Sequence, residues 1–197
     1  MNMTICDWAL HSTLENVYHD TEWGIPKTDD QELFELLILE GMQAGLSWHL
    51  ILKRRENMRQ ILEQFDYHKL AMYTDEQLDM LLQDTRLIRN KLKIYAIRTN
   101  AQCFLQIQKD YGSFARYIWK FVDYQPIQNK WATIEQVPCF SSLSDKISKE
   151  LKKRGFKFIG TKIIYSFLQA SGMINDHLTS CPCYSLKKYD RINLKKQ

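Results

Sequence analysis

The sequence contains few of the residues that interrupt helices, with 7 glycines and 4 prolines among 197 residues. No apolar run is as long as a membrane span, and no pattern predicts a pair of strands or an internal repeat. Asp7 and His11 interrupt the first residues, so no signal peptide is expected. These absences argue against membrane-spanning and secreted proteins and favour a soluble, helical, cytoplasmic one.

A disulfide framework is also not expected. Five cysteines is an odd number, and without an export signal they should be reduced thiols or metal ligands. Lys and Arg total 27 against 23 Asp and Glu, a formal net charge of only +4, so the position of the charges matters more than their sum. The hydrophobic fraction of 45% is enough for a core in one domain or two small ones.

Helical periodicity covers most of the chain and predicts an all-α fold of about eight helices. The first should begin at Thr28, which has capping-box spacing to Gln31. Apolar side chains at 33–39 cover more than one face, so this helix should be central and buried. Residues 1–27 look irregular or only briefly helical, and residues 123–143 look like a long connection. The other helices are expected over residues 47–65, 67–72, 74–82, 90–110, 113–122, 144–154 and 161–170.

The stretch 39–48, Leu-Glu-Gly-Met-Gln-Ala-Gly-Leu-Ser-Trp, joins the first two long helices. Glu40 lies beside apolar surface, where a carboxylate is costly to bury without a task or a partner. Gly41 and Gly45 allow a backbone or a ligand to approach closely, and Trp48 offers a flat face with one N–H donor. Together they suit a pocket for a flat, positively charged or amino-bearing ring. The alternative is a plain helix–turn–helix corner with a capping tryptophan.

The segment Tyr18-His-Asp-Thr-Glu-Trp-Gly24 is dense in functional side chains. The alternative is an N-terminal segment that packs its aromatic residues over the core. Farther along, residues 86–98 carry five basic side chains and no acid, at a turn that opens a helix. Such a turn suits a phosphate group, although an exposed basic helix face is common. A second basic segment spans 149–162, with Glu150 as its acid.

His177 and Cys181 are four residues apart, and Cys6 and His19 lie near the other end of the chain. Zinc favours four such ligands in a tetrahedron, and a Cys₂His₂ site would join the two chain ends. It would have no open position, so its role would be structural. By itself the spacing is a weak pattern, and Cys183 is a rival to Cys181.

Four motifs in order resemble bacterial DNA-3-methyladenine glycosylase I: Tyr18–Gly24, 39–48, Lys152-Lys-Arg-Gly-Phe-Lys-Phe-Ile-Gly160, and Asn175-Asp-His177 with Cys181. The likeness extends from about residue 6 to 183. It implies an all-α fold of the helix-hairpin-helix glycosylase superfamily that excises N3-methylated adenine from alkylated double-stranded DNA. It implies one structural zinc ion, a base pocket and DNA contacts. The implied zinc ligands are Cys6, His19, His177 and Cys181, and the implied pocket residues are Tyr18, Glu40 and Trp48.

Within this resemblance Glu40 is the catalytic-site carboxylate, acting first in base recognition. A cationic base is a good leaving group, so we expect monofunctional hydrolysis by water without a lysine Schiff base. We expect a monomer with one domain over 1–184, in which 1–27 and 173–184 form the zinc-joined ends, and a basic tail over 185–197. No membrane or protein partner is implied. The candidate DNA contacts are Arg89, Lys91, Lys93, Lys153 and Arg154.

Two positions depart from the family pattern. Glu15 stands where the family commonly has a tyrosine, three residues before the Tyr-His pair. The turn 87–93 lacks the glycines of a helix-hairpin-helix hairpin, and no matching aspartate follows it. A non-catalytic protein that binds alkylated DNA is therefore an alternative, and a zinc-stapled interaction domain is a weaker one.

Overall fold

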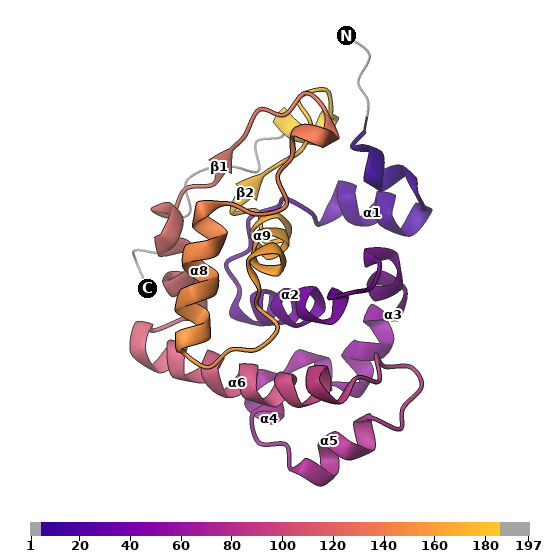
Figure 1. Ribbon diagram of the computed structural model, residues 1–197, viewed down its shortest axis with the longest axis vertical. Coiled ribbons are helices and arrows are strands. Elements are labelled where there is room, and N and C mark those ends of the chain that lie inside the picture. Colours follow the sequence, from indigo (N-terminus) through magenta and orange to yellow (C-terminus); the bar gives the residue numbers. More distant parts are fainter. Residues whose placement is uncertain (1–4, 186–197) are drawn as a thin grey trace.

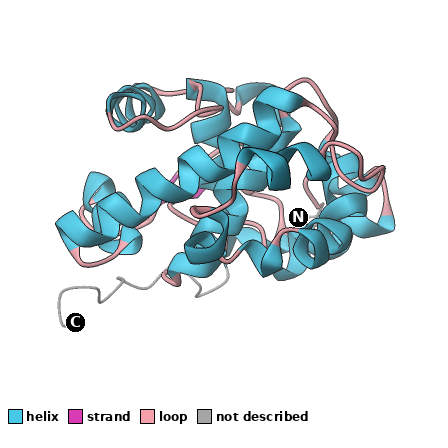
Figure 2. Cartoon of the chain, turned by 90° about the horizontal axis from the view of Figure 1, so that it is seen from below, coloured by secondary structure: helices cyan, strands magenta, loops and turns pink. Residues whose placement is uncertain are grey.

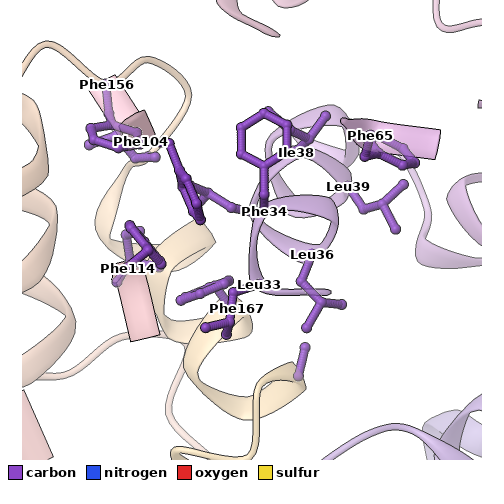
Figure 3. Packing of buried hydrophobic residues seen from close by; sticks show 14 of the residues in the cluster. Leu33, Phe34, Leu36, Ile38, Leu39, Phe65, Phe104, Phe114, Phe156 and Phe167 are labelled. Atoms are coloured by element: carbon purple, nitrogen blue, oxygen red, sulfur yellow. The ribbon is translucent and has the colours of Figure 1, made fainter. Parts of the chain in front are cut away.

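Helix α2 (Asp30–Gln43) is the centre of the fold in the computed structural model, which describes residues 5–185. All ten residues from Leu33 to Met42 are buried. Figure 3 shows phenylalanine rings converging on α2 from the surrounding segments, and the Phe34 and Phe104 ring centroids are 5.1 Å apart. The prediction of a buried central helix is confirmed. Its N-cap lies one residue later than the expected Thr28, because the Asp29 carboxylate accepts from the Glu32 N–H.

Helices account for nearly all of the regular structure in the described part of the chain, as Figure 2 shows, and the all-α prediction is confirmed. None of them is both long and apolar enough to cross a membrane. Figure 1 shows α6 crossing beneath α2, with α1 and the start of α3 at one side. The remaining helices are α1 (Thr13–Thr21), α3 (Trp48–Ile61), α4 (Tyr67–Leu70), α5 (Asp75–Leu81), α6 (Lys91–Tyr111), α7 (Phe114–Trp119), α8 (Ser142–Lys153) and α9 (Thr161–Ala170).

The N-terminal end of α2 is fixed to its neighbours by polar contacts. The Asp30 carboxylate accepts from the backbone N–H groups of Phe114 and Ala115 at 2.9 and 2.8 Å, which caps α7.

Gly172 has φ +70°, and a Cβ there would lie 2.3 Å from the Pro26 nitrogen. The turn after α9 therefore needs glycine to pack against the segment that leads into α2.

Helix α3 ends at Ile61, four residues before the predicted end at 65. Glu63, Gln64 and Phe65 all have φ between 54° and 57°, in the left-handed region. Phe65 is fully buried, and this change of backbone conformation places its ring in the core. Packing of one aromatic side chain overrides a helical pattern that continues in the sequence.

Residues 123–143 are mostly irregular, as predicted, but contain strand β1 (Ile127–Gln128), which pairs in parallel with β2 (Ile174–Asn175). The sequence predicted no strand, because two residues are too few to show a period of two. Trp131 Nε1–H also donates to Asp176 at 2.7 Å. This segment thus lies beside the chain that carries His177. Of the predicted basic tail, residues 186–197 lie outside the described range, and the single-domain extent stays a prediction.

Candidate active site and metal centre

The turn between α2 and α3 positions Glu40 and Trp48. Glu40 lies in the last turn of α2, and Trp48 is the first residue of α3. Gly45 adopts φ +78° between them, which favours glycine. The buried Lys93 ammonium donates to the carbonyl oxygens of Met42 and Ala44 at 2.8 and 2.6 Å. These bonds satisfy the last carbonyls of α2 and hold the turn in place.

Gly41 allows the close approach of a neighbouring backbone, which is one of the two uses expected from its motif. A Cβ there would lie 3.3 Å from the Cβ of Phe158, so Gly41 lets the segment before α9 pack against α2. It does not open space for a ligand.

Tyr18, Glu40 and Trp48 line one cavity of about 430 Å³, although they come from α1, α2 and α3. The Tyr18 and Trp48 ring centroids are 5.3 Å apart at 54°. The structure therefore brings together all three residues of the predicted pocket. The volume matches a small-molecule pocket, and its aromatic walls suit a flat ring.

Each of these three residues carries a buried polar atom without a hydrogen-bond partner among the described residues: Tyr18 Oη, Glu40 Oε2 and Trp48 Nε1. Buried polar atoms in folded proteins are nearly always paired, since each orphan costs about 1–3 kcal/mol. All three residues line one cavity, and this arrangement is the one expected of a site that binds a polar ligand.

Burial also changes the protonation of this pocket. Desolvation raises the pKa of Glu40 to about 8, so its carboxyl group carries a proton at neutral pH while the cavity is empty. Desolvation likewise raises the pKa of the Tyr18 hydroxyl, and the neighbouring Glu40 adds to this rise. A cationic ligand would favour the ionised form of Glu40 over the protonated one.

The sequence reasoning missed much of the cavity wall. Trp8 and Gln43, which were not singled out, line it, and so does Glu15, the position already identified as a departure from the family pattern. Glu15 is three residues before Tyr18, which places both on one face of α1, and helical periodicity over 13–21 was the available signal. The opposite wall comes from α9 and the 134–139 segment, whose placement needs the tertiary structure. Its polar residues are Lys162, Ser166 and Gln169 on α9.

A second buried polar group lies next to this cavity. Cys6, His19, His177 and Cys181 are all buried, and their ligand atoms lie within 4.8 Å of one another. His177 Nδ1 is 3.1 Å from His19 Nε2 and 3.7 Å from Cys181 Sγ, and Cys181 Sγ is 3.5 Å from His19 Nε2. The structure therefore joins the two ends of the described chain at one point.

These distances fit a tetrahedral metal site. Zinc with N and S ligands at their usual bond lengths gives ligand–ligand edges of about 3.3–3.8 Å. His19 Nδ1 lies 2.7 Å from the Asp20 carboxylate, which leaves Nε2 as the ligand atom. A hydrogen bond from the Cys6 thiol holds the pKa of Cys181 far below its ordinary value, with further contributions from His177 and His19. The four residues could thus hold a metal ion. Cys183 instead falls in a separate group with His19 and Asp20.

Comparison with known proteins identifies this arrangement. The sequence profile described as methyladenine glycosylase matches residues 8–184. The chain belongs to the methyladenine glycosylase family. DNA-3-methyladenine glycosylase 1 of Escherichia coli (strain K12) is 47% identical over 182 residues, which cover 92% of this chain and 97% of that protein. The DNA-3-methyladenine glycosylase of Haemophilus influenzae is 44% identical, with coverage of 91% and 97%.

Solved structures agree with this family membership. A crystal structure of 3-methyladenine DNA glycosylase I matches with a TM-score of 0.89 at 48% identity, covering 91% of this chain and 99% of that chain. The Staphylococcus aureus enzyme, whose structure addresses 3-methyladenine recognition, matches with a TM-score of 0.88 at 34% identity, covering 92% and 97%.

The candidate DNA contacts of this glycosylase separate into two groups. Arg89 and Lys91 are exposed at the start of α6, the end that lies close to the α2–α3 turn. Lys153 and Arg154 lie at the other end of α6, where Arg154 pairs with Asp110 at 3.3 Å. Because α6 has 21 residues, the two groups are roughly 30 Å apart. The structure therefore separates Arg89 and Lys91 from Lys153 and Arg154, although residues 157 and 158 of the second basic segment lie against the middle of α6.

Lys93 requires a correction. It was expected to contact phosphate, but its side chain is buried and its ammonium bonds two carbonyls of the α2–α3 turn. A helical period places Lys93 on the opposite face from Lys91, toward α2. Lys93 therefore positions the pocket, and its ammonium is not available to a DNA backbone.

Proposed function

We propose that this glycosylase binds alkylated double-stranded DNA, takes 3-methyladenine out of the base stack and excises it by monofunctional hydrolysis. The observation that carries the proposal is the cavity lined by Tyr18, Glu40 and Trp48, each of which has a buried polar atom without a partner among the described residues. An enzyme that acts on one base of a duplex must hold that base in such a pocket. The relatives in the same family bear the name of this activity.

Recognition rests on the positive charge of the methylated base. Within the duplex, 3-methyladenine is a cation, so contact with the faces of Trp48 and Tyr18 adds a cation–π contribution to stacking. Glu40 gives up its proton as the cation binds and accepts hydrogen bonds from the amino edge of the ring. A neutral adenine provides no charge to offset the cost of ionising a buried carboxyl group.

Excision follows from the same charge. The bond between the sugar C1′ and the base nitrogen breaks, and its electron pair neutralises the departing cation. A water oxygen bonds to C1′, and the proton from this water passes to solvent. No amine attack is needed, so we assign no Schiff base to Lys162, the lysine that the described residues place on the cavity wall. Glu40 acts in base recognition first.

For the cysteine and histidine cluster we propose one structural zinc ion held by Cys6, His19, His177 and Cys181. Two thiolates and two imidazoles form a complete tetrahedral set, and such a site has no position for a substrate or a water. Cys6 also lines the cavity, so the ion would stabilise one wall of the base pocket by fixing the segment that carries Trp8.

For DNA contact we propose the start of α6. Its first backbone N–H groups and helix dipole attract phosphate, and Arg89 and Lys91 add exposed positive charge. Lys153 and Arg154 belong to a second basic surface at the far end of α6. We assign them at most a secondary role on the same duplex.

The deciding experiment is release of free 3-methyladenine from methylated duplex DNA by wild-type protein, Glu40→Gln and Trp48→Ala. We expect release by wild type and a loss of about 10- to 100-fold in each variant, since each removes one recognition contact worth about 1–3 kcal/mol. Glu56→Gln, at an exposed position on α3, is the matched control and should keep full activity. Metal content and melting temperature verify that each variant is folded.

Two results would count against the proposal. Wild-type protein that binds methylated DNA but releases no base is a non-catalytic binder of damaged DNA. Protein that is trapped covalently on DNA by borohydride forms a Schiff base, which contradicts the monofunctional mechanism.

A further inference from the structure

Glu15 is a second acidic residue on the wall of the base cavity. Its side chain is 9% exposed, and it lies three residues before Tyr18 on the same face of α1. A buried carboxylate has a high desolvation cost, so it is kept where it has partners or a task. Glu15 is therefore in a position to act on whatever occupies the space beside Tyr18 and Trp48.

A short relay of hydrogen bonds holds this carboxylate. The Ser12 hydroxyl donates to Glu15 Oε2 at 2.8 Å, and His49 Nδ1 lies 3.0 Å from the Ser12 oxygen and 3.7 Å from the same carboxylate oxygen. His49 directly follows Trp48 at the start of α3, so the relay connects α1 to the helix that carries the stacking ring. Within residues 5–185, Oε1 of Glu15 accepts no hydrogen bond and is free for a ligand.

The three acidic residues on the cavity wall differ in what they offer. Asp176 accepts hydrogen bonds on both oxygens, from residues that include Trp131 and Tyr165, and is structural. Glu40 is deeply buried, has no partner on Oε2 and holds its proton while the cavity is empty. Glu15 is partnered on one oxygen only. It is thus the acid whose side chain is held in place through one oxygen while the other oxygen can contact an arriving ligand.

We infer that Glu15, positioned by Ser12 and His49, is a specificity-determining residue that raises the preference of the pocket for a positively charged base over a neutral one. The inference rests on the proposed excision of a cationic base and adds a second carboxylate to its recognition. The Glu15 carboxylate attracts the cation beside the Tyr18–Trp48 pair, and Glu40 contacts its amino edge. Lys162, on the α9 wall, is a cationic side chain that repels a cationic base, and the attraction by Glu15 must be stronger than this repulsion.

The test uses two free ligands of nearly equal shape and different charge. The 3,9-dimethyladeninium ion is a permanent cation, and 9-methyladenine is neutral. Calorimetry measures the affinity of wild type, Glu15→Gln and Glu15→Asp for both. We expect Glu15→Gln to reduce the preference for the cation about tenfold while binding of the neutral ligand stays within twofold. Glu15→Asp keeps the charge and should retain the preference within about threefold.

Controls separate this effect from loss of structure. Glu56→Gln removes an exposed carboxylate from α3 and should change neither affinity. Melting temperature and metal content should be unchanged in Glu15→Gln, because the Ser12 cap of α1 uses the Glu15 backbone N–H and not its side chain. His49→Leu removes the partner of Ser12 and should reduce the preference about threefold.

The outcomes are distinct. Equal weakening of both ligands in Glu15→Gln, or no change for either, overturns the role of Glu15 alone. Wild-type protein that binds neither ligand, or prefers the neutral one, overturns the proposed recognition of a cationic base and this inference with it.

Discussion

The cysteine and histidine cluster and the base cavity are neighbours that share Cys6 on a common wall, yet their polar atoms are arranged in opposite ways. In the cluster, every ligand atom lies close to the other three. In the cavity, Tyr18, Glu40 and Trp48 each keep a polar atom without a partner. A group whose polar atoms face one another can stabilise the fold, whereas a group whose buried polar atoms lack partners lowers stability and can gain hydrogen bonds from a ligand. Substitutions in the two regions should therefore have opposite effects.

Loss of the metal should have the largest effect. Structural zinc contributes binding free energy of about 10–16 kcal/mol in isolated zinc-binding peptides, and part of this would hold the chain ends together in the proposed site. We expect Cys181→Ser, or a strong chelator, to lower the melting temperature by more than about 10 °C in a circular-dichroism scan. Cys139→Ser, at an exposed thiol, is the matched control and should have no effect. An unchanged melting temperature in protein shown to be metal-free would contradict a stabilising ion.

Glu40→Gln should stabilise the protein while it impairs activity. The pKa of Glu40 is raised from 4.5 to about 8 in the folded state, so between these pH values the unfolded chain loses a proton that the native state keeps. Wild-type stability therefore falls as pH rises through this window. At about 1.36 kcal/mol per pH unit, the variant should gain roughly 3 kcal/mol at pH 7 and nothing near pH 4. Urea unfolding at both pH values measures this, and a gain independent of pH would contradict the assigned cause.

Trp48→Ala should reduce excision about 10- to 100-fold, because stacking on an aromatic side chain is worth about 1–3 kcal/mol per base. Trp48→Phe keeps a flat face and should lose much less. Single-turnover rates on methylated duplex DNA measure both. If the alanine and phenylalanine variants lose the same amount, the indole N–H and not the ring face is the group that matters.

Removing one positive charge at either end of α6 should have a small effect on DNA binding, and the effect should differ between the two ends. Each phosphate contact adds about 0.9 to the slope of log affinity against log salt concentration. Lys91→Gln should lower this slope by about one for a methylated duplex, while Lys153→Gln should leave it unchanged. A larger change in the slope for Lys153→Gln than for Lys91→Gln would show that the DNA binds at the other basic surface.

The residues that could be predicted belong either to a pattern within a few neighbouring residues or to a contiguous motif. The buried central helix, the Thr74–Gln77 capping box and the helix over 161–170 follow from spacing within a few residues, and the structure confirms them. The resemblance added the long-range statement that Tyr18, Glu40 and Trp48 belong together. The positions that failed are Lys93, whose side chain turns inward, and the end of α3, where burial of Phe65 decides the backbone.

The sequence by itself determined the helical class, the family and the residue types of the pocket and the cluster, because these depend on periodicity, capping and contiguous motifs. Only the tertiary structure decided which polar atoms are left without partners, which way Lys93 points, and that Glu15, Ser12 and His49 meet at the cavity. The physical reason is that burial and hydrogen bonding are sums over neighbours from the whole chain. Spacing along the sequence does not say which residues are neighbours in space. It therefore does not reveal which buried groups lack a hydrogen-bond partner.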